Sequence, residues 1–268
     1  GLNGTTMYRS DNYDRSGKSV AGAGDVNADG YADFIIGATG GDWNSIADAG
    51  KSHLIFGKAG GWDARWKLAN LDGIDGVEIN GAAVNDGSGS VVSGAGDVNG
   101  DGFGDVLIVA RGAGVYGETY LVFGKGAGWT PSVALADLDG TDGVVIASRD
   151  GGDKLEITAS GVGDVNDDGY DDVIIGMGRA NSNGMDSAGE SYLVFGRADG
   201  WPASLSASSL DGVNGVLFVG AGASDMSGRS VSGAGDINGD GIADILIGAP
   251  GAVGGDSYVV FGRAASWG

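Results

Sequence analysis

The chain has 268 residues, a formal net charge of −21, no cysteine, 57 glycines and only three prolines. The acidic balance argues against nucleic acid or an anionic membrane surface as a partner, because both attract basic patches. The absence of cysteine excludes disulfides, thiolate zinc sites and a thiol nucleophile.

The first predicted unit contains four short strands. Small and apolar residues alternate over 19–24, an acidic loop follows at 25–33, and a continuous apolar run covers 34–38. A third strand is expected over 53–57 and a fourth over 71–79. Continuous apolar runs in the second strands indicate burial on both faces. Because no stretch has sustained helical periodicity, the chain is predicted to be all-β.

The acidic loop returns three times along the chain, at 97–105, 164–172 and 236–244. Its first aspartates stand at 25, 97, 164 and 236, so the steps are 72, 67 and 72 residues. Repeats of this kind indicate stacked units, and four-stranded units arranged radially form a β-propeller. We therefore expect residues 1–268 to be one propeller domain of four antiparallel, four-stranded blades.

The two ends of the chain favour a closed ring. Residues 1–7 align with 73–79, which is the last strand of a unit, and residues 258–261 align with a third strand. The N-terminal strand is therefore expected to complete the last blade. The alternative is that the four repeats belong to a larger propeller, since propellers have up to about eight blades. The sequence begins at Gly1 with no signal peptide and no apolar run of membrane-spanning length, which indicates a mature or excised chain.

Each acidic loop has the donor set of a hard-cation site. Oxygen-bearing side chains occupy positions 1, 3, 5 and 9, glycine occupies position 6, and the residue at position 7 offers a backbone carbonyl. Calcium fits best because it accepts six to eight oxygen ligands in flexible geometry. Isoleucine at position 12 in every copy excludes an EF-hand, which needs glutamate there. The predicted ligands of four calcium ions are Asp25, Asn27, Asp29, Tyr31, Asp33, Asp97, Asn99, Asp101, Phe103, Asp105, Asp164, Asn166, Asp168, Tyr170, Asp172, Asp236, Asn238, Asp240, Ile242 and Asp244.

The alternative for these loops is a set of metal-free turns whose side chains bond to the local backbone. Four calcium ions would change the net charge from −21 to −21 + 8 = −13. Open loops of this kind need a high calcium concentration, which favours an extracellular or cell-surface location.

Two further motifs flank the loops. Phe-Gly pairs recur at 56–57, 123–124, 195–196 and 261–262, and Gly-Ala-Pro occurs at 248–250. With the loops, they resemble the FG-GAP repeats of integrin α-subunits, and the Leu-Asp-Gly-x-x-Gly segments are similar to the bacterial surface-protein branch. The resemblance implies a calcium-binding β-propeller with a binding or adhesion role and names no ligand. The third repeat departs from the pattern, with Leu155-Glu156 where the other repeats have Ser-Gly.

A ligand site is expected on the face opposite the calcium loops, where the connections between second and third strands are variable. Trp43, Tyr116 and Met185 lie in these loops and are candidates for contact with a glycan or a protein. The alternative is that they pack over their own loops. The repeated Trp62, Trp129, Trp201 and Trp267 are predicted to pack within the units, while His53 and Glu156 are assigned no functional role.

Three functions compete. The preferred one is an extracellular, calcium-stabilised module that binds a glycan or a protein surface. The second is a polysaccharide-acting enzyme at the channel mouth, which would need a carboxylate pair such as Asp42 or Asp48 with Glu118. The third is a structural subunit whose free blade edges join copies of the chain. With one histidine, no cysteine and no nucleophile motif, the chain is not expected to be an enzyme.

Overall fold

Four mainly antiparallel β-sheets form the body of the protein, which is described by a computed structural model over residues 4–8, 13–148, 156–198, 200–264 and 267. Sheet 1 contains β2 (Ser16–Gly24), β3 (Asp33–Ala38), β4 (Lys51–Ile55) and β6 (Gly76–Asn80). Sheet 2 contains β7 (Ser88–Gly96), β8 (Asp105–Ala110), β9 (Glu118–Val122) and β11 (Gly143–Ala147). Sheet 3 contains β12 (Ile157–Gly163), β13 (Asp172–Met177), β14 (Glu190–Val194) and β16 (Gly215–Val219). Sheet 4 contains β17 (Ser230–Gly235), β18 (Asp244–Ala249) and β19 (Asp256–Val260).

Three short strands, two of which join their sheet to the one before it, precede the fourth strands of sheets 1 to 3. They are β5 (Arg65–Lys67), β10 (Ser132–Ala134) and β15 (Ser204–Ser206), and each leads into a 3-10 turn, namely η1 (Leu68–Asn70), η2 (Leu135–Asp137) and η4 (Ala207–Ser209). Strand β10 pairs in parallel with β6 of sheet 1, and β15 pairs in parallel with β11 of sheet 2. The sequence patterns did not predict these three-residue strands.

Most of the hydrophobic core lies between the sheets, and a smaller cluster in the first repeat contains Ile36, Ile55, Trp66 and Leu68. One cluster joins sheets 1 and 2, another joins sheets 2 and 3, and a third joins sheets 3 and 4. The first strands of neighbouring sheets pack closely: a Cβ on Gly94 would lie 2.8 Å from the carbonyl oxygen of Gly22, and one on Gly161 would lie 2.8 Å from that of Gly94. The small residues of these strands are therefore required by the approach of neighbouring sheets.

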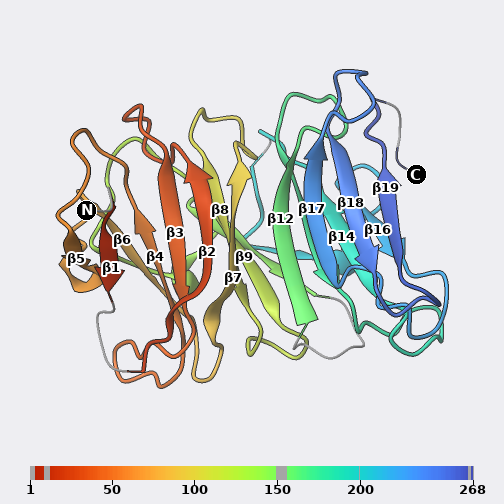
Figure 1. Cartoon of the computed structure of the whole chain (residues 1–268), viewed down its shortest axis with the longest axis horizontal. Coiled ribbons are helices and arrows are strands. Elements are labelled where there is room, and N and C mark those ends of the chain that lie inside the picture. Colours follow the sequence, from red (N-terminus) through yellow and green to blue (C-terminus); the bar gives the residue numbers. More distant parts are fainter. Residues whose placement is uncertain (1–3, 9–12, 149–155, 199, 265–266, 268) are drawn as a thin grey trace.

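The sheets stand in a row, with the N- and C-termini at opposite ends of the molecule (Figure 1). Strand β2 lies against β7, β7 against β12, and β12 against β17. The predicted all-β architecture is confirmed. In the part of the chain that the structure describes, no helix has the length and apolar character needed to cross a membrane.

The predicted closure of the last sheet by the N-terminal strand is wrong within the described residues. Strand β1 (Thr6–Tyr8) pairs in parallel with β5 of the first repeat, and sheet 4 has three strands. The reason is the row of sheets, which holds the N-terminal strand far from β19 and next to the free edge of β5. Residues 1–3 of the aligned segment lie outside the described part of the chain.

Candidate metal centres

In each acidic loop, the side chains at positions 1, 3 and 5 turn inward and bind backbone N–H groups of the same loop. In the first copy, the carboxylate of Asp25 accepts hydrogen bonds from the N–H groups of Asp29 (3.2 Å) and Gly30 (2.9 Å). The side-chain oxygen of Asn27 also accepts from Asp29 N–H (3.0 Å), and the carboxylate of Asp29 accepts from Tyr31 N–H (2.9 Å). The other three loops repeat all four bonds. The structure thus brings together three of the predicted ligand side chains in every copy.

The aspartate at position 9 has a second partner, which the sequence did not predict. Asp33 accepts from Val26 N–H (2.8 Å) at the start of the loop and from Gly57 N–H (2.6 Å) in the Phe-Gly pair. Asp105, Asp172 and Asp244 make the equivalent bonds. A Cβ on Gly57 would lie 2.4 Å from the carbonyl oxygen of Ala32. The glycine of each Phe-Gly pair therefore lets the third strand approach the acidic loop.

Burial perturbs the pKa of Asp33, Asp105 and Asp172. Burial raises the pKa of Asp33 to about 6 and those of Asp105 and Asp172 to about 8, and the carboxylates at positions 1 and 5 raise them further, against the lowering effect of the two backbone hydrogen bonds. At the exposed position 1 of the fourth loop, hydrogen bonds led by that from Gly241 N–H lower the pKa of Asp236. A bound cation would compensate the negative charge of such a buried carboxylate and so favour its ionised form.

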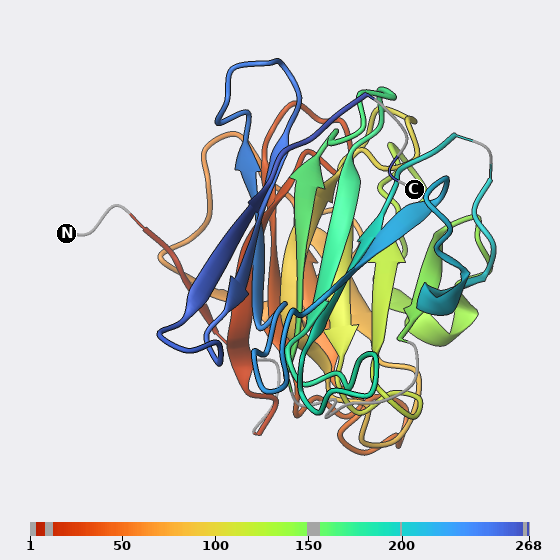
Figure 2. The same cartoon turned by 90° about the vertical axis from the view of Figure 1, so that its right-hand side faces the viewer.

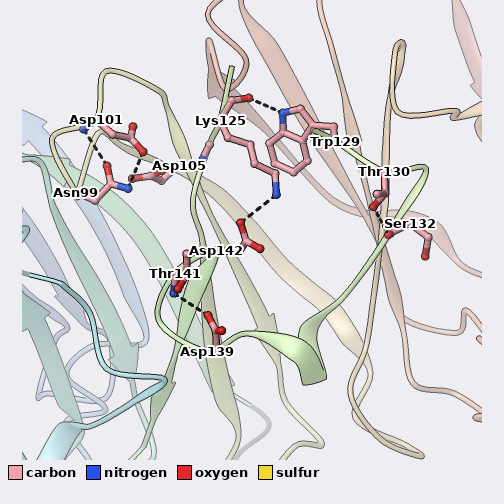
Figure 3. A network of polar contacts seen from close by, with 11 residues as sticks. Asn99, Asp101, Asp105, Lys125, Trp129, Thr130, Ser132, Asp139, Thr141 and Asp142 are labelled. Carbon is pink, nitrogen blue, oxygen red and sulfur yellow. Dashed lines mark hydrogen bonds and ion pairs between the residues drawn. The ribbon is translucent and has the colours of Figure 1, made fainter. Parts of the chain in front are cut away.

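The four loops also bind one another in a row. The N–H of Gly104 donates to the carbonyl of Asp25 in the preceding loop (2.8 Å), and Asp171 and Ala243 make the same bond to the loops before them (3.1 Å each). Figure 3 shows the second loop beside Lys125, whose ammonium group binds Asp142 (3.0 Å) and whose carbonyl accepts from the indole N–H of Trp129 (2.8 Å). The acidic loops are therefore part of the framework that joins the sheets.

The donor set of the loops fits calcium. Within the described part of the chain, no three acidic or histidine side chains meet as a finished metal cage. A carboxylate has about four lone-pair sites, however, so Asp25 and Asp29 keep acceptor capacity beyond the backbone bonds they make. Oxygen donors alone, from carboxylates, one amide and one carbonyl, are what calcium prefers. The binding of calcium stays a prediction.

The repeated tryptophans are packing residues, as predicted, but three of them pack between repeats and not within one. Trp129 lies against Phe56 of the preceding repeat (5.7 Å between ring centroids), Trp201 against Phe123 (5.8 Å) and Trp267 against Phe195 (5.9 Å). A lysine or arginine lies over the ring of each repeated tryptophan, including Trp62. Trp129, Trp201 and Trp267 therefore join adjacent sheets.

The candidate ligand residues lie at the opposite ends of the strands from the acidic loops. Each acidic loop joins a first strand to its antiparallel second strand, so the connections between second and third strands emerge on the other side. Trp43 is half-buried and its backbone pairs with Ile46, Met185 pairs in the same way with Ser182, and Tyr116 packs against the core between sheets 2 and 3. They belong to three different loops, on sheets 1, 3 and 2.

The sequence missed a group of basic residues on this same side. Arg15, Lys18 and Arg111 line a hollow of about 410 Å³ between sheets 1 and 2. Near sheet 3, Glu156 binds Arg179 (3.1 Å) and Arg229 (2.5 Å), two ion pairs that the sequence did not predict. Each ion pair joins residues that are far apart in the sequence, so no local sequence pattern predicts it.

The carboxylates proposed for catalysis have structural partners. Asp42 accepts from the N–H of Asp48 (2.8 Å) within its own loop, and Glu118 accepts from the hydroxyl of Tyr120 (2.7 Å). Burial, followed by the hydrogen bond and the negative charge of Glu118, raises the pKa of Tyr120. These contacts support the loops and the third strand.

A family comparison agrees with the repeated loop. The FG-GAP repeat model matches residues 16–55 and 227–261. The first match covers β2 to β4 with the first acidic loop, and the second covers β17 to β19 with the fourth loop. The predicted family resemblance is confirmed over these two segments.

Proposed function

We propose that this FG-GAP repeat chain is a calcium-stabilised, extracellular binding module of the β-propeller type. FG-GAP repeats suggest a binding or adhesion module of this architecture. The observation that carries the proposal is the fourfold repetition of one inward-turned acidic loop, bonded at position 9 to the Phe-Gly pair of its own sheet. Turns that only reverse the chain need no buried, hard-to-ionise carboxylate.

Calcium would act as a structural ion. The side chains at positions 1, 3, 5 and 9 and the carbonyl of position 7 would hold it, and its charge would compensate carboxylates that burial otherwise disfavours. Because the loops bond to one another in a row, an ion in each would stiffen one whole side of the molecule. Sites so open to solvent would fill at the calcium concentrations found outside cells.

The ligand would bind at the opposite side, where the connecting loops differ among the repeats. Trp43, Tyr116 and Met185 offer apolar surface there for a sugar ring or a protein side chain. Arg15, Lys18 and Arg111 add cationic groups to a chain whose net charge is −21. The proposed ligand is therefore a glycan or a protein surface.

Two measurements test the proposal. Native mass spectrometry in calcium should show four bound ions, and chelation should lower the melting temperature; an unchanged melt would overturn the calcium role. Binding to a panel of glycans and surface proteins should then be weakened in Trp43→Ala and unchanged in Ile74→Ala, which truncates an exposed apolar side chain at the acidic-loop end of the same sheet. Equal loss in both variants would place the ligand elsewhere.

A further inference from the structure

One face of sheet 4 is exposed at positions that are buried in the other three sheets. Ile237, Leu246, Val259 and Phe261 are between 39 and 54% exposed. Their counterparts are at most 4% exposed, because the next sheet covers them. The counterparts are Val26, Ile35, Leu54 and Phe56 in sheet 1, Val98, Leu107, Leu121 and Phe123 in sheet 2, and Val165, Ile174, Leu193 and Phe195 in sheet 3. Figure 2 looks toward this end of the molecule, with β19 in dark blue at the front.

The same sheet has an unpaired strand edge. In sheets 1 to 3 the third strand pairs with a fourth strand, whereas within the described residues β19 pairs with β18 alone. A free edge beside an exposed apolar face is a site for adding a strand from another chain.

The N-terminal end of the molecule carries a strand of the kind that sheet 4 lacks. Strand β1 pairs with β5 in the register in which the fourth strands β6 and β11 pair with β10 and β15: Thr6 lies opposite Arg65, as Glu78 lies opposite Ser132. In the described residues the other edge of β1 is free. Strand β1 therefore already occupies the place of a fourth strand, with one edge open to a third strand from another chain.

The aromatic contacts between sheets point to the same pairing. Three phenylalanines of the Phe-Gly pairs pack on the tryptophan of the following repeat. Among the described rings, Phe261 lacks such a tryptophan, and Trp62 packs on Trp66 of its own repeat and not on a preceding phenylalanine. Trp62 lines a hollow of about 500 Å³ together with Met7 and Phe34.

We propose that the two ends bind each other between copies of this chain, head to tail. Strand β19 of one copy pairs antiparallel with β1 of a second copy, and Phe261 packs on Trp62 of that copy. The occupant is a second copy because the strand, the ring and the apolar face missing at one end are all present at the other. This inference is independent of the ligand proposed above.

Charge supports the same register. If β19 and β1 pair as β14 and β16 do in sheet 3, Asp256 lies opposite Tyr8 of the second copy and Ser257 lies opposite its Met7. Tyr8 borders a hollow of about 630 Å³ that Arg15 and Arg65 also line, so an acidic side chain arrives beside two cations. Two copies would contribute eight sheets, and a head-to-tail contact closes into a ring when its rotation allows.

Sedimentation of the purified chain in calcium tests the assembly. We expect a species of twice the chain mass that Phe261→Glu converts to monomer. Val253→Glu is the matched control, because Val253 is fully exposed in a loop of the same sheet, and it should leave the assembly intact. A wild-type monomer, as expected if other segments of a longer polypeptide cover these ends, would overturn the proposal, and so would an assembly that survives Phe261→Glu.

Disulfide trapping tests the register in a chain that has no cysteine of its own. Under oxidising conditions Ser257→Cys with Met7→Cys should give reducible, covalently joined copies. Ser257→Cys with Thr6→Cys should not, because neighbouring residues of a strand point to opposite faces. Equal trapping in both pairs would refute the proposed strand pairing.

Discussion

The calcium-free protein is expected to lose stability as the pH rises from 5 to 8. Burial raises the pKa of Asp33 to about 6 and those of Asp105 and Asp172 to about 8, from an ordinary value of 3.8. The folded state therefore holds these protons more tightly than the unfolded chain does. The resulting stabilisation is complete below the unfolded pKa and is lost as the pH rises through the folded pKa.

One buried group opposes this trend at lower pH. Burial, with a smaller effect of Lys51, lowers the pKa of His53 to about 4, so its contribution to stability grows as the pH rises toward 6.5. Exposed aspartates whose pKa is lowered titrate below pH 4 and do not act in this range. Above pH 6.5 the difference in bound protons between the folded and unfolded states comes mainly from Asp105 and Asp172. One proton each corresponds to about 1.4 kcal/mol per pH unit, so the free energy of unfolding should fall by up to about 3 kcal/mol per unit between pH 6.5 and 7.5.

Urea unfolding in calcium-stripped buffer at pH 6.5, 7.0 and 7.5 measures this slope. Asp105→Asn keeps the size of the side chain and removes one titrating proton, so it should reduce the slope by about half. Saturating calcium should abolish the slope in the wild-type chain, because a bound cation favours the ionised carboxylates. A calcium-free stability that is flat or rises over this range would refute the assignment of buried, protonated aspartates.

Four other variants test separate parts of the structure. Asp29→Ala should reduce the bound calcium ions in native mass spectra from four to three, and loss of none or of all four would contradict independent sites. Trp201→Ala should lower the free energy of unfolding by about 3–5 kcal/mol, because Trp201 is buried against Phe123. Trp43→Ala, in a surface loop, should cost far less, and equal losses in urea unfolding would contradict this difference. Glu156→Gln should cost about 1 kcal/mol or less and lose its effect at high salt, since its two arginine partners are nearly half exposed; a loss that persists in salt would contradict it.

The repeated strands were predictable because their signals are local. The continuous apolar run at 34–38 and the acidic loop before it determine a buried strand and a tight connection wherever they recur. Strands β5, β10 and β15 were missed because each has only three residues and pairs with a strand of another repeat. The sequence correctly matched the N-terminal strand to the fourth strands of the repeats. Its partner strand, however, depends on how the sheets are arranged in space, and the sequence pattern of one repeat does not specify that arrangement.

The candidate site was predictable in part for the same reason. Positions 1, 3 and 5 converge through bonds within nine residues, so Asp25 and Asp29 could be assigned together. The bond from Gly57 to Asp33 joins the loop to the end of the third strand. That contact gives the glycine of the Phe-Gly pair its physical role, and only the folded sheet reveals it. The ion pairs of Glu156 were not predicted because both of its arginine partners come from other segments of the chain.

The position-9 aspartates join the charge of the acidic loops to the contacts between sheets. Asp33 holds Gly57, and the adjoining Phe56 packs on Trp129 of the next repeat. A cation that allows this aspartate to ionise would therefore strengthen the acceptor that positions the ring joining two sheets. Asp244 holds Gly262 in the same way, and the adjoining Phe261 is the ring proposed to bind a second copy. The fourth acidic loop thus positions the ring of the proposed end contact through the same hydrogen bond that positions the phenylalanine rings between the other sheets.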